Sequence, residues 1–206
     1  YDGDETIDGV PGAAAAIPIF FSNLAGSNCG SLMPTGNVID ILDGVECTLI
    51  DNGMPCVLIK AAEFGITGRE SRDKLEVNSE VKSAIESIRL QAGSLMELGD
   101  VTKKSVPKMT LISEPLNGGV VNTRSFIPHR VHASIGVFAA ITVATACIIP
   151  ETVAASLAQL PVDGSYKIEH LSGSVNVRIE RDDSGTIERT GIVLTARKLM
   201  DGAVYA

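Results

Sequence analysis

Hydrophobic and polar residues change their spacing several times along this chain of 206 residues. Residues 1–60 consist of short apolar runs separated by Gly, Pro and Asn, a pattern typical of strands joined by tight loops. Between Asn78 and Met96 the apolar residues recur at steps of three and four, which predicts an amphipathic helix with Asn78 or Ser79 as its N-cap. Its apolar face is expected to contain Val81, Ile85, Ile88, Ala92 and Leu95.

The stretch from Ala133 to Ile149 has no charged side chain and is apolar on every side. It is shorter than the roughly 20 residues that span a bilayer, so we expect a helix buried in protein. The alternative is a surface helix with Thr142 and Thr145 on a solvated edge. Strands are predicted around this helix, at 106–113, within 117–129, at 174–180 and at 186–196, with a turn at 181–185.

An apolar helix among many strands can bury its whole surface only if sheet surrounds it. We therefore predict an α+β fold in which a curled, barrel-like mixed β-sheet surrounds a central apolar helix. Every face of that helix, including Val137 near its start, is then expected to be enclosed.

Composition excludes several classes of function. The net charge of -8 and the absence of Trp argue against a nucleic-acid partner, because binding to phosphate and bases needs basic and aromatic groups. The four cysteines have no C-x-x-C spacing, so we expect no disulfide framework, and this usage suits a reducing cytoplasm. We also predict no membrane partner.

The residues directly in front of the apolar helix include several basic or polar side chains, namely Arg124, Ser125, His129, Arg130, His132 and Ser134. The first turn of a helix has unpaired N–H groups and a partial positive charge, so it favours a carboxylate. The alternative is that Ser134 only caps the helix and Arg124 pairs with a surface acid. His129 and His132 suggest a metal, but no third ligand has a recognisable spacing, so we predict none.

Two loops are further candidates for binding. The Gly-rich stretch 25–37 offers backbone N–H groups to an anion, although an ordinary loop that needs Gly for φ > 0 is the preferred interpretation. In the turn-rich stretch 50–56, Asn52 is expected either to bind a substrate oxygen or to close the turn. No nucleophile is paired with a base by any local signature.

Several of these stretches resemble one known family. The segments are LMPTGNVID, CTLIDNGMP, GDVTKKSVPKM and NGGVVNTRSFIPHRVHASIGVFAAITVATACII, with DGVPG near the start and TARKLMDG near the end. They resemble the methylaconitate isomerase (PrpF) family, whose fold is similar to that of diaminopimelate epimerase. The resemblance implies two lobes, each a curled sheet around a central helix, with the active site between the two helix N-termini.

The resemblance covers only one lobe of such a protein. Residues 1–12 are expected to cross over from a missing N-terminal lobe, and 13–206 to form the C-terminal lobe, whose last strand could return to the missing one. The acid and base of the family lie in the missing lobe, so the catalytic residues are unknown here and this stretch alone is expected to be inactive. The cysteine that starts this helix in the epimerases has no counterpart in HASIGVF, and LTAR stands where relatives show RTAR.

The implied function is a cofactor-independent isomerase or tautomerase that moves a proton on an unsaturated keto-polycarboxylate. The match favours 4-oxalomesaconate, in gallate- or protocatechuate-type degradation of aromatic acids. The alternatives are an isomerase of the methylaconitate or aconitate type and a catalytically incomplete carboxylate-binding fragment. The expected partners are a tricarboxylate or keto-acid substrate and the missing N-terminal lobe, and a homodimer is left open. The implied substrate-binding residues are Arg124, Ser125, His129, His132, Ser134, Ile135, Gly136, Asn52, Gly53 and Met54.

Overall fold

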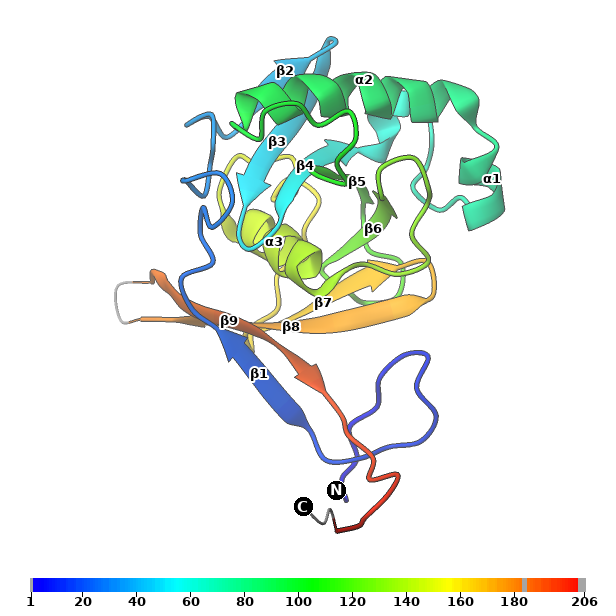
Figure 1. Cartoon of the computed structure of the whole chain (residues 1–206), viewed down its shortest axis with the longest axis vertical. Helices are drawn as coiled ribbons and strands as arrows, with labels where there is room; N and C mark the ends of the chain where they lie inside the picture. The colour runs from blue at the N-terminus through cyan, green and yellow to red at the C-terminus, as the bar shows by residue number, and fades with distance from the viewer. Residues whose placement is uncertain (1, 183–184, 204–206) are drawn as a thin grey trace.

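The computed structural model describes residues 2–182 and 185–203, and its main element is one mixed sheet of nine strands (Figure 1). Two turn residues of the predicted 181–185 turn, Asp183 and Ser184, lie outside the described residues. The strands are β1 (Ile17–Phe21), β2 (Asp40–Leu42), β3 (Val45–Asp51), β4 (Pro55–Lys60), β5 (Lys108–Ser113), β6 (Val121–Phe126), β7 (Ser165–His170), β8 (Gly173–Arg181) and β9 (Ile187–Leu194). The helices are η1 (Ala61–Phe64), α1 (Arg72–Glu76), α2 (Ser79–Leu95) and α3 (Val137–Ile148).

The sheet curls around α3 but does not close. Its order is β1-β9-β8-β7-β6-β5-β4-β3-β2, with the pairs β4/β5 and β6/β7 parallel and the others antiparallel. Helix α3 contacts β3 and β4 on one side and β7, β8 and β9 on the other (Figure 1). The predicted α+β class is confirmed, whereas the barrel-like closure is not, because the two edge strands β1 and β2 do not pair with each other.

Helix α3 is the central helix that the sequence predicts, but it is shorter. It begins at Val137, with Gly136 in an extended conformation as its N-cap, so the prediction that it starts at Ala133 is wrong. Thr142 and Thr145 are both fully buried, which excludes the surface-helix alternative. Val137 is nevertheless 36% exposed, because the first turn projects beyond the sheet, and the expectation that every face is enclosed is wrong there.

Helix α2 covers the opposite face of the sheet from α3 (Figure 1). As predicted, the Asn78 side chain caps it, accepting a hydrogen bond from Val81 N at 3.1 Å. The predicted apolar face is buried except at its last member, Leu95, which is 45% exposed. Met96, one position further along, is fully buried in its place, since positions three and four residues after Ala92 both lie near the buried face.

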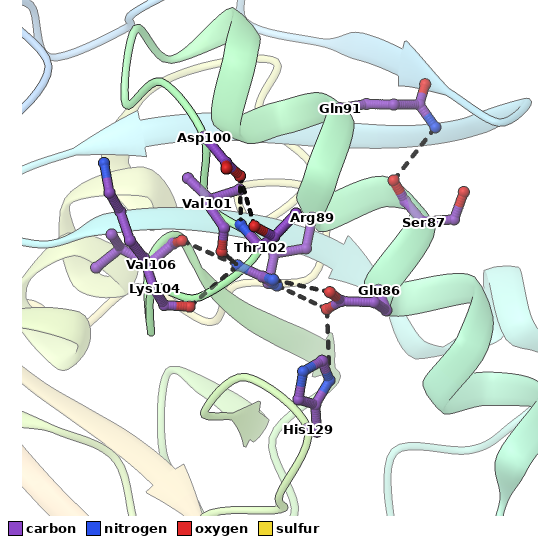
Figure 2. Close-up of polar contacts among 10 residues, drawn as sticks. All are labelled: Glu86, Ser87, Arg89, Gln91, Asp100, Val101, Thr102, Lys104, Val106 and His129. Atoms are coloured by element: carbon purple, nitrogen blue, oxygen red, sulfur yellow. Dashed lines mark hydrogen bonds and ion pairs between the residues drawn. The ribbon is translucent and has the colours of Figure 1, made fainter.

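A buried arginine on α2 fixes the loop that leads into β5 (Figure 2). The Arg89 side chain is fully buried and donates two hydrogen bonds to the Glu86 carboxylate, at 2.6 and 2.8 Å. Its Nη1 also donates to the carbonyl oxygens of Val101, Lys104 and Val106, at 3.0, 3.3 and 3.1 Å. The start of β5 is therefore held rigidly relative to α2.

Among the described residues, no helix is both long and apolar enough to cross a bilayer. The four cysteines are free and buried.

Candidate functional site

The N-terminus of α3 has no side-chain cap among the described residues. The first backbone hydrogen bond of the helix runs from Ala140 N to Gly136 O, at 2.8 Å. The N–H groups of Val137, Phe138 and Ala139 therefore lack an acceptor within the helix. Together with the helix dipole they form an electropositive end that favours an anion. The alternative in which Ser134 caps this helix is wrong, since Gly136 occupies the N-cap position.

A pocket of about 110 Å³ opens at this helix end, between α3, the β3–β4 loop and the strands β5 and β6. Its floor includes Ser125, which is 5% exposed and whose Oγ lies 3.3 Å from the Thr110 Oγ1. The pocket is lined by Met54, Lys108, Ser125, Ile127, Gly136, Val137, Phe138 and Ala139. Three of the predicted site residues, Met54, Ser125 and Gly136, are thereby brought together.

Lys108 is the titratable side chain that lines this pocket, and the sequence reasoning missed it. It is the first residue of β5 and is half-buried. Burial lowers the pKa of its ammonium group, because the charged form loses hydration. The available signal was the alternation of β5, which places Lys108 and Ile112 on the face that packs against α3.

The loop between β3 and β4 is fastened to the side of α3. The Asn52 Nδ2 donates to Thr145 Oγ1 at 2.8 Å, and the Thr142 hydroxyl lies 3.3 Å from Asn52 N and 3.1 Å from both Asn52 O and Met54 O. Gly53 has φ 91, and a Cβ there would lie 3.0 Å from the Phe138 ring. The Asn52 amide is thus used within the protein, at the edge of a separate pocket of about 310 Å³, while Met54 reaches the site at α3.

A second polar cluster lies beside the segment that precedes α3. His132 Nδ1 accepts a hydrogen bond from Ser134 N at 3.0 Å, and Ser134 Oγ lies 3.3 Å from His170 Nε2. The His170 Nδ1 accepts from Ser172 N at 3.3 Å, so the neutral ring donates from Nε2 to Ser134. Burial lowers the pKa of His170, against a smaller rise caused by the Asp8 carboxylate. The sequence did not indicate His170, because this residue is far from Ser134 along the chain and comes close to it only in the folded protein.

Two predicted site residues lie on the other face of the sheet. His129 is 58% exposed, and its Nδ1 lies 3.5 Å from Glu86 on α2 (Figure 2). Arg124 is 5% exposed and donates to Glu70 O at 3.0 Å, to Asn122 Oδ1 at 2.9 Å and to Thr123 O at 2.8 Å. The structure does not bring either side chain to the α3 pocket, and the carboxylate contact proposed for Arg124 stays a prediction.

Two further candidates for ligand binding, Ile135 and the Gly-rich loop, make contacts within the protein that account for them. The Ile135 side chain is 7% exposed and belongs to the core around α3, so that only its backbone is available to a ligand. In the Gly-rich loop, the N–H groups of Asn28 and Cys29 donate to Asp51 Oδ2 at 2.7 and 2.9 Å. The fully buried Asp51 carboxylate thus occupies the N–H groups that an external anion would need.

The four cysteines are held as neutral thiols. Burial raises the pKa of the Cys29, Cys47 and Cys147 thiols to about 12, and the pKa of Cys56 is raised as well. All four thiols are therefore protonated near neutral pH. No three His, Cys, Asp or Glu side chains of the described part lie close enough together to hold a metal ion.

Comparison with known proteins gives three concordant findings. The chain matches the model of the PrpF protein family over residues 1–206. It is 55% identical over 208 residues to the (4E)-oxalomesaconate Delta-isomerase of Novosphingobium sp. (strain KA1), covering 100% of this chain and 58% of the relative. It is 53% identical over 206 residues to the 4-oxalomesaconate tautomerase of Pseudomonas putida, covering 99% of this chain and 57% of the relative.

One solved structure has the same fold. The crystal structure of methylitaconate-delta-isomerase superposes with a TM-score of 0.89 and 26% sequence identity, covering 98% of this chain and 58% of that one. The chain therefore spans less than two thirds of the length of each of these proteins.

Proposed function

The chain belongs to the PrpF family, and from that premise we propose that it is the substrate-binding lobe of an isomerase acting on an unsaturated keto-polycarboxylate. The single observation that carries this proposal is the uncapped N-terminus of α3, which opens into a pocket containing Lys108 and Ser125. The residues that line it supply three N–H groups without a partner in the helix, the Ser125 hydroxyl and the Lys108 ammonium group, and all of these groups favour a carboxylate. Met54 and Ile127 line the same pocket and would exclude water from it.

The same arrangement suits the chemistry of proton transfer between carbons. Removal of a proton beside a carboxylate or keto group leaves a negative charge that is delocalised onto oxygen. Hydrogen-bond donors that are already oriented toward that oxygen lower the barrier, because they need no reorganisation during the reaction. The N–H groups of Val137 and Phe138 are fixed by the helix and fulfil this condition.

The acid and base of the reaction are assigned to a second lobe. The thiols of the described part are held in the neutral form, and no nucleophile–base pair lies at the α3 pocket. We propose that residues 13–206 form one lobe, that 1–12 connect it to the other, and that the active site lies where the two lobes meet. The first segment is attached to this lobe, since the Asp8 carboxylate accepts hydrogen bonds from Ser174 N and Oγ at 2.7 and 2.8 Å.

The proposed substrate is 4-oxalomesaconate, which fits a place in the degradation of gallate-type aromatic acids. The high identity to two relatives named for this compound supports it. An isomerase of the methylaconitate type is the second candidate, supported by the fold shared with the methylitaconate isomerase.

The test is a steady-state assay of the full-length purified protein with 4-oxalomesaconate and with 2-methylaconitate. We expect isomerisation of 4-oxalomesaconate without added metal or organic cofactor, and residues 1–206 alone are expected to show no turnover. Faster turnover of 2-methylaconitate would show that this compound, and not 4-oxalomesaconate, is the substrate. A folded full-length protein that isomerises neither compound would contradict the proposal.

A further inference from the structure

Lys108 is placed at the α3 pocket by the register of two parallel strands. It is the first residue of β5 and pairs with Cys56 of β4, at the end of these strands that faces the start of α3. The preceding loop is held by the hydrogen bonds of Arg89 to three carbonyl oxygens (Figure 2). The base of the Lys108 side chain is therefore fixed.

The ammonium group of Lys108 has no counterion in the described part of the chain. Lys108 makes no hydrogen bond or ion pair with any of the described residues, and no acidic side chain lines the pocket. The neighbouring groups are mainly apolar, from Met54, Ile127 and Phe138. Leaving a partly desolvated cation without a partner is unfavourable, and burial accordingly lowers the pKa of Lys108.

The start of α3 carries a partial charge of the same sign as the lysine. The uncapped end of α3 is electropositive, and its Gly136 and Val137 line the same pocket as Lys108. Two positive groups that face one small cavity without an acid between them stabilise a bound anion from two sides. A ligand with more than one carboxylate fits this arrangement better than a monocarboxylate.

We infer that Lys108 is a substrate-binding residue that determines specificity, and that it binds a second carboxylate of the polycarboxylate whose first carboxylate lies at the N-terminus of α3. This inference rests on the proposed function and deepens it, because it assigns the selection of polycarboxylates to one side chain. It differs from a role in proton transfer, which would leave binding unchanged.

The experiment uses calorimetric binding of two probes to the full-length protein. Tricarballylate has three carboxylates on a propane chain, and butyrate has the same chain with only one. We expect the wild type to prefer tricarballylate by at least about 10-fold, since a hydrogen bond to a charged group contributes about 1.5–3 kcal/mol. Lys108→Met should lose that preference and raise the KM for substrate about 10- to 100-fold, with kcat changed far less. Lys108→Arg should restore most of the preference.

The matched control is Lys60→Met, a half-buried lysine of the neighbouring strand β4. Lys60 lies four residues after Cys56, the residue that pairs with Lys108. This places Lys60 about 13 Å from Lys108 along the strand direction. This variant should retain the wild-type preference. If Lys108→Met does not fold, Lys108→Gln replaces it, because its polar end tolerates water.

Three outcomes would overturn the inference. A folded Lys108→Met protein that keeps the preference within twofold shows that the ammonium does not bind the carboxylate. Loss of kcat with unchanged affinity and preference assigns Lys108 to proton transfer instead. If the wild type binds neither probe and isomerises no unsaturated polycarboxylate, the proposed function fails first, and the inference fails with it.

Discussion

The substitution Val137→Pro removes one N–H group from the start of α3 without removing the helix. Val137 is the first helical residue, the position where proline is best tolerated, because its N–H has no partner within the helix. The preceding Gly136 has φ -68 and ψ 149, the extended conformation that a residue before proline requires. Val137 is also 36% exposed, so the ring has room. We expect the melting temperature to stay within about 3 °C of the wild type, because no described hydrogen bond is lost.

The effect on activity follows from the bond that is lost. A hydrogen bond from this N–H to a carboxylate or enolate oxygen contributes about 1.5–3 kcal/mol. Each 1.36 kcal/mol is a factor of ten, so kcat/KM of the full-length protein should fall about 10- to 150-fold. Val137→Ala is the control, since it removes the same side chain but keeps the N–H. If Val137→Pro is folded and as active as Val137→Ala, this N–H does not contact the substrate and the reasoning is refuted.

Four further changes test the framework around the site. Thr142→Val should lower the free energy of unfolding by about 2 kcal/mol in urea, because the β3–β4 loop loses the hydrogen bonds of that hydroxyl. Thr190→Val is its control, since Thr190 is 2% exposed and its hydroxyl makes no described hydrogen bond; equal losses would contradict the expectation. Gly53→Ala should cost about 1–3 kcal/mol, because φ 91 is unfavourable for alanine, and an unchanged melting temperature would argue against it. Arg89→Met should cost about 3–5 kcal/mol, because an acid and three carbonyl groups lose their donor, and a loss below about 1 kcal/mol would count against it. Asp8 has a pKa held below its usual 3.8 by hydrogen bonds from the β7–β8 hairpin, so its stabilisation is present above about pH 4 and is lost as the pH falls through the lowered value. Asp8→Asn should therefore melt below the wild type at pH 7 and converge with it only as the pH falls below the lowered pKa of Asp8, whereas a difference that is constant with pH would disprove this linkage.

The elements that depend on local spacing could be predicted from the sequence. The steps of three and four around Ile85 and Ile88 gave α2 and its Asn78 cap, because a helical face repeats over neighbouring residues. The apolar run predicted α3 as a central helix, because a helix that is apolar on every side must be buried over several turns. Its exact start was missed, because Ser134 looks like a cap by residue type and only the backbone conformation shows that Gly136 is the cap.

The parts of the site that depend on strand pairing could not be predicted. Lys108 reaches the pocket because β5 pairs with β4 and β6, and His170 reaches Ser134 because β7 pairs with β6. These pairings join residues that are far apart in the sequence, and no local pattern records them. Arg124 and His129 were grouped with their sequence neighbours, whereas the alternation of β6 and the turn after it direct them toward α1 and α2.

The most direct test of the central claim is a crystal structure of the full-length protein with tricarballylate or its substrate bound. The account predicts a carboxylate oxygen at hydrogen-bonding distance, about 2.7–3.2 Å, from the backbone nitrogen of Val137 or Phe138. A ligand bound instead in the separate pocket beside Asn52 and Arg189, with no contact to the start of α3, would contradict it.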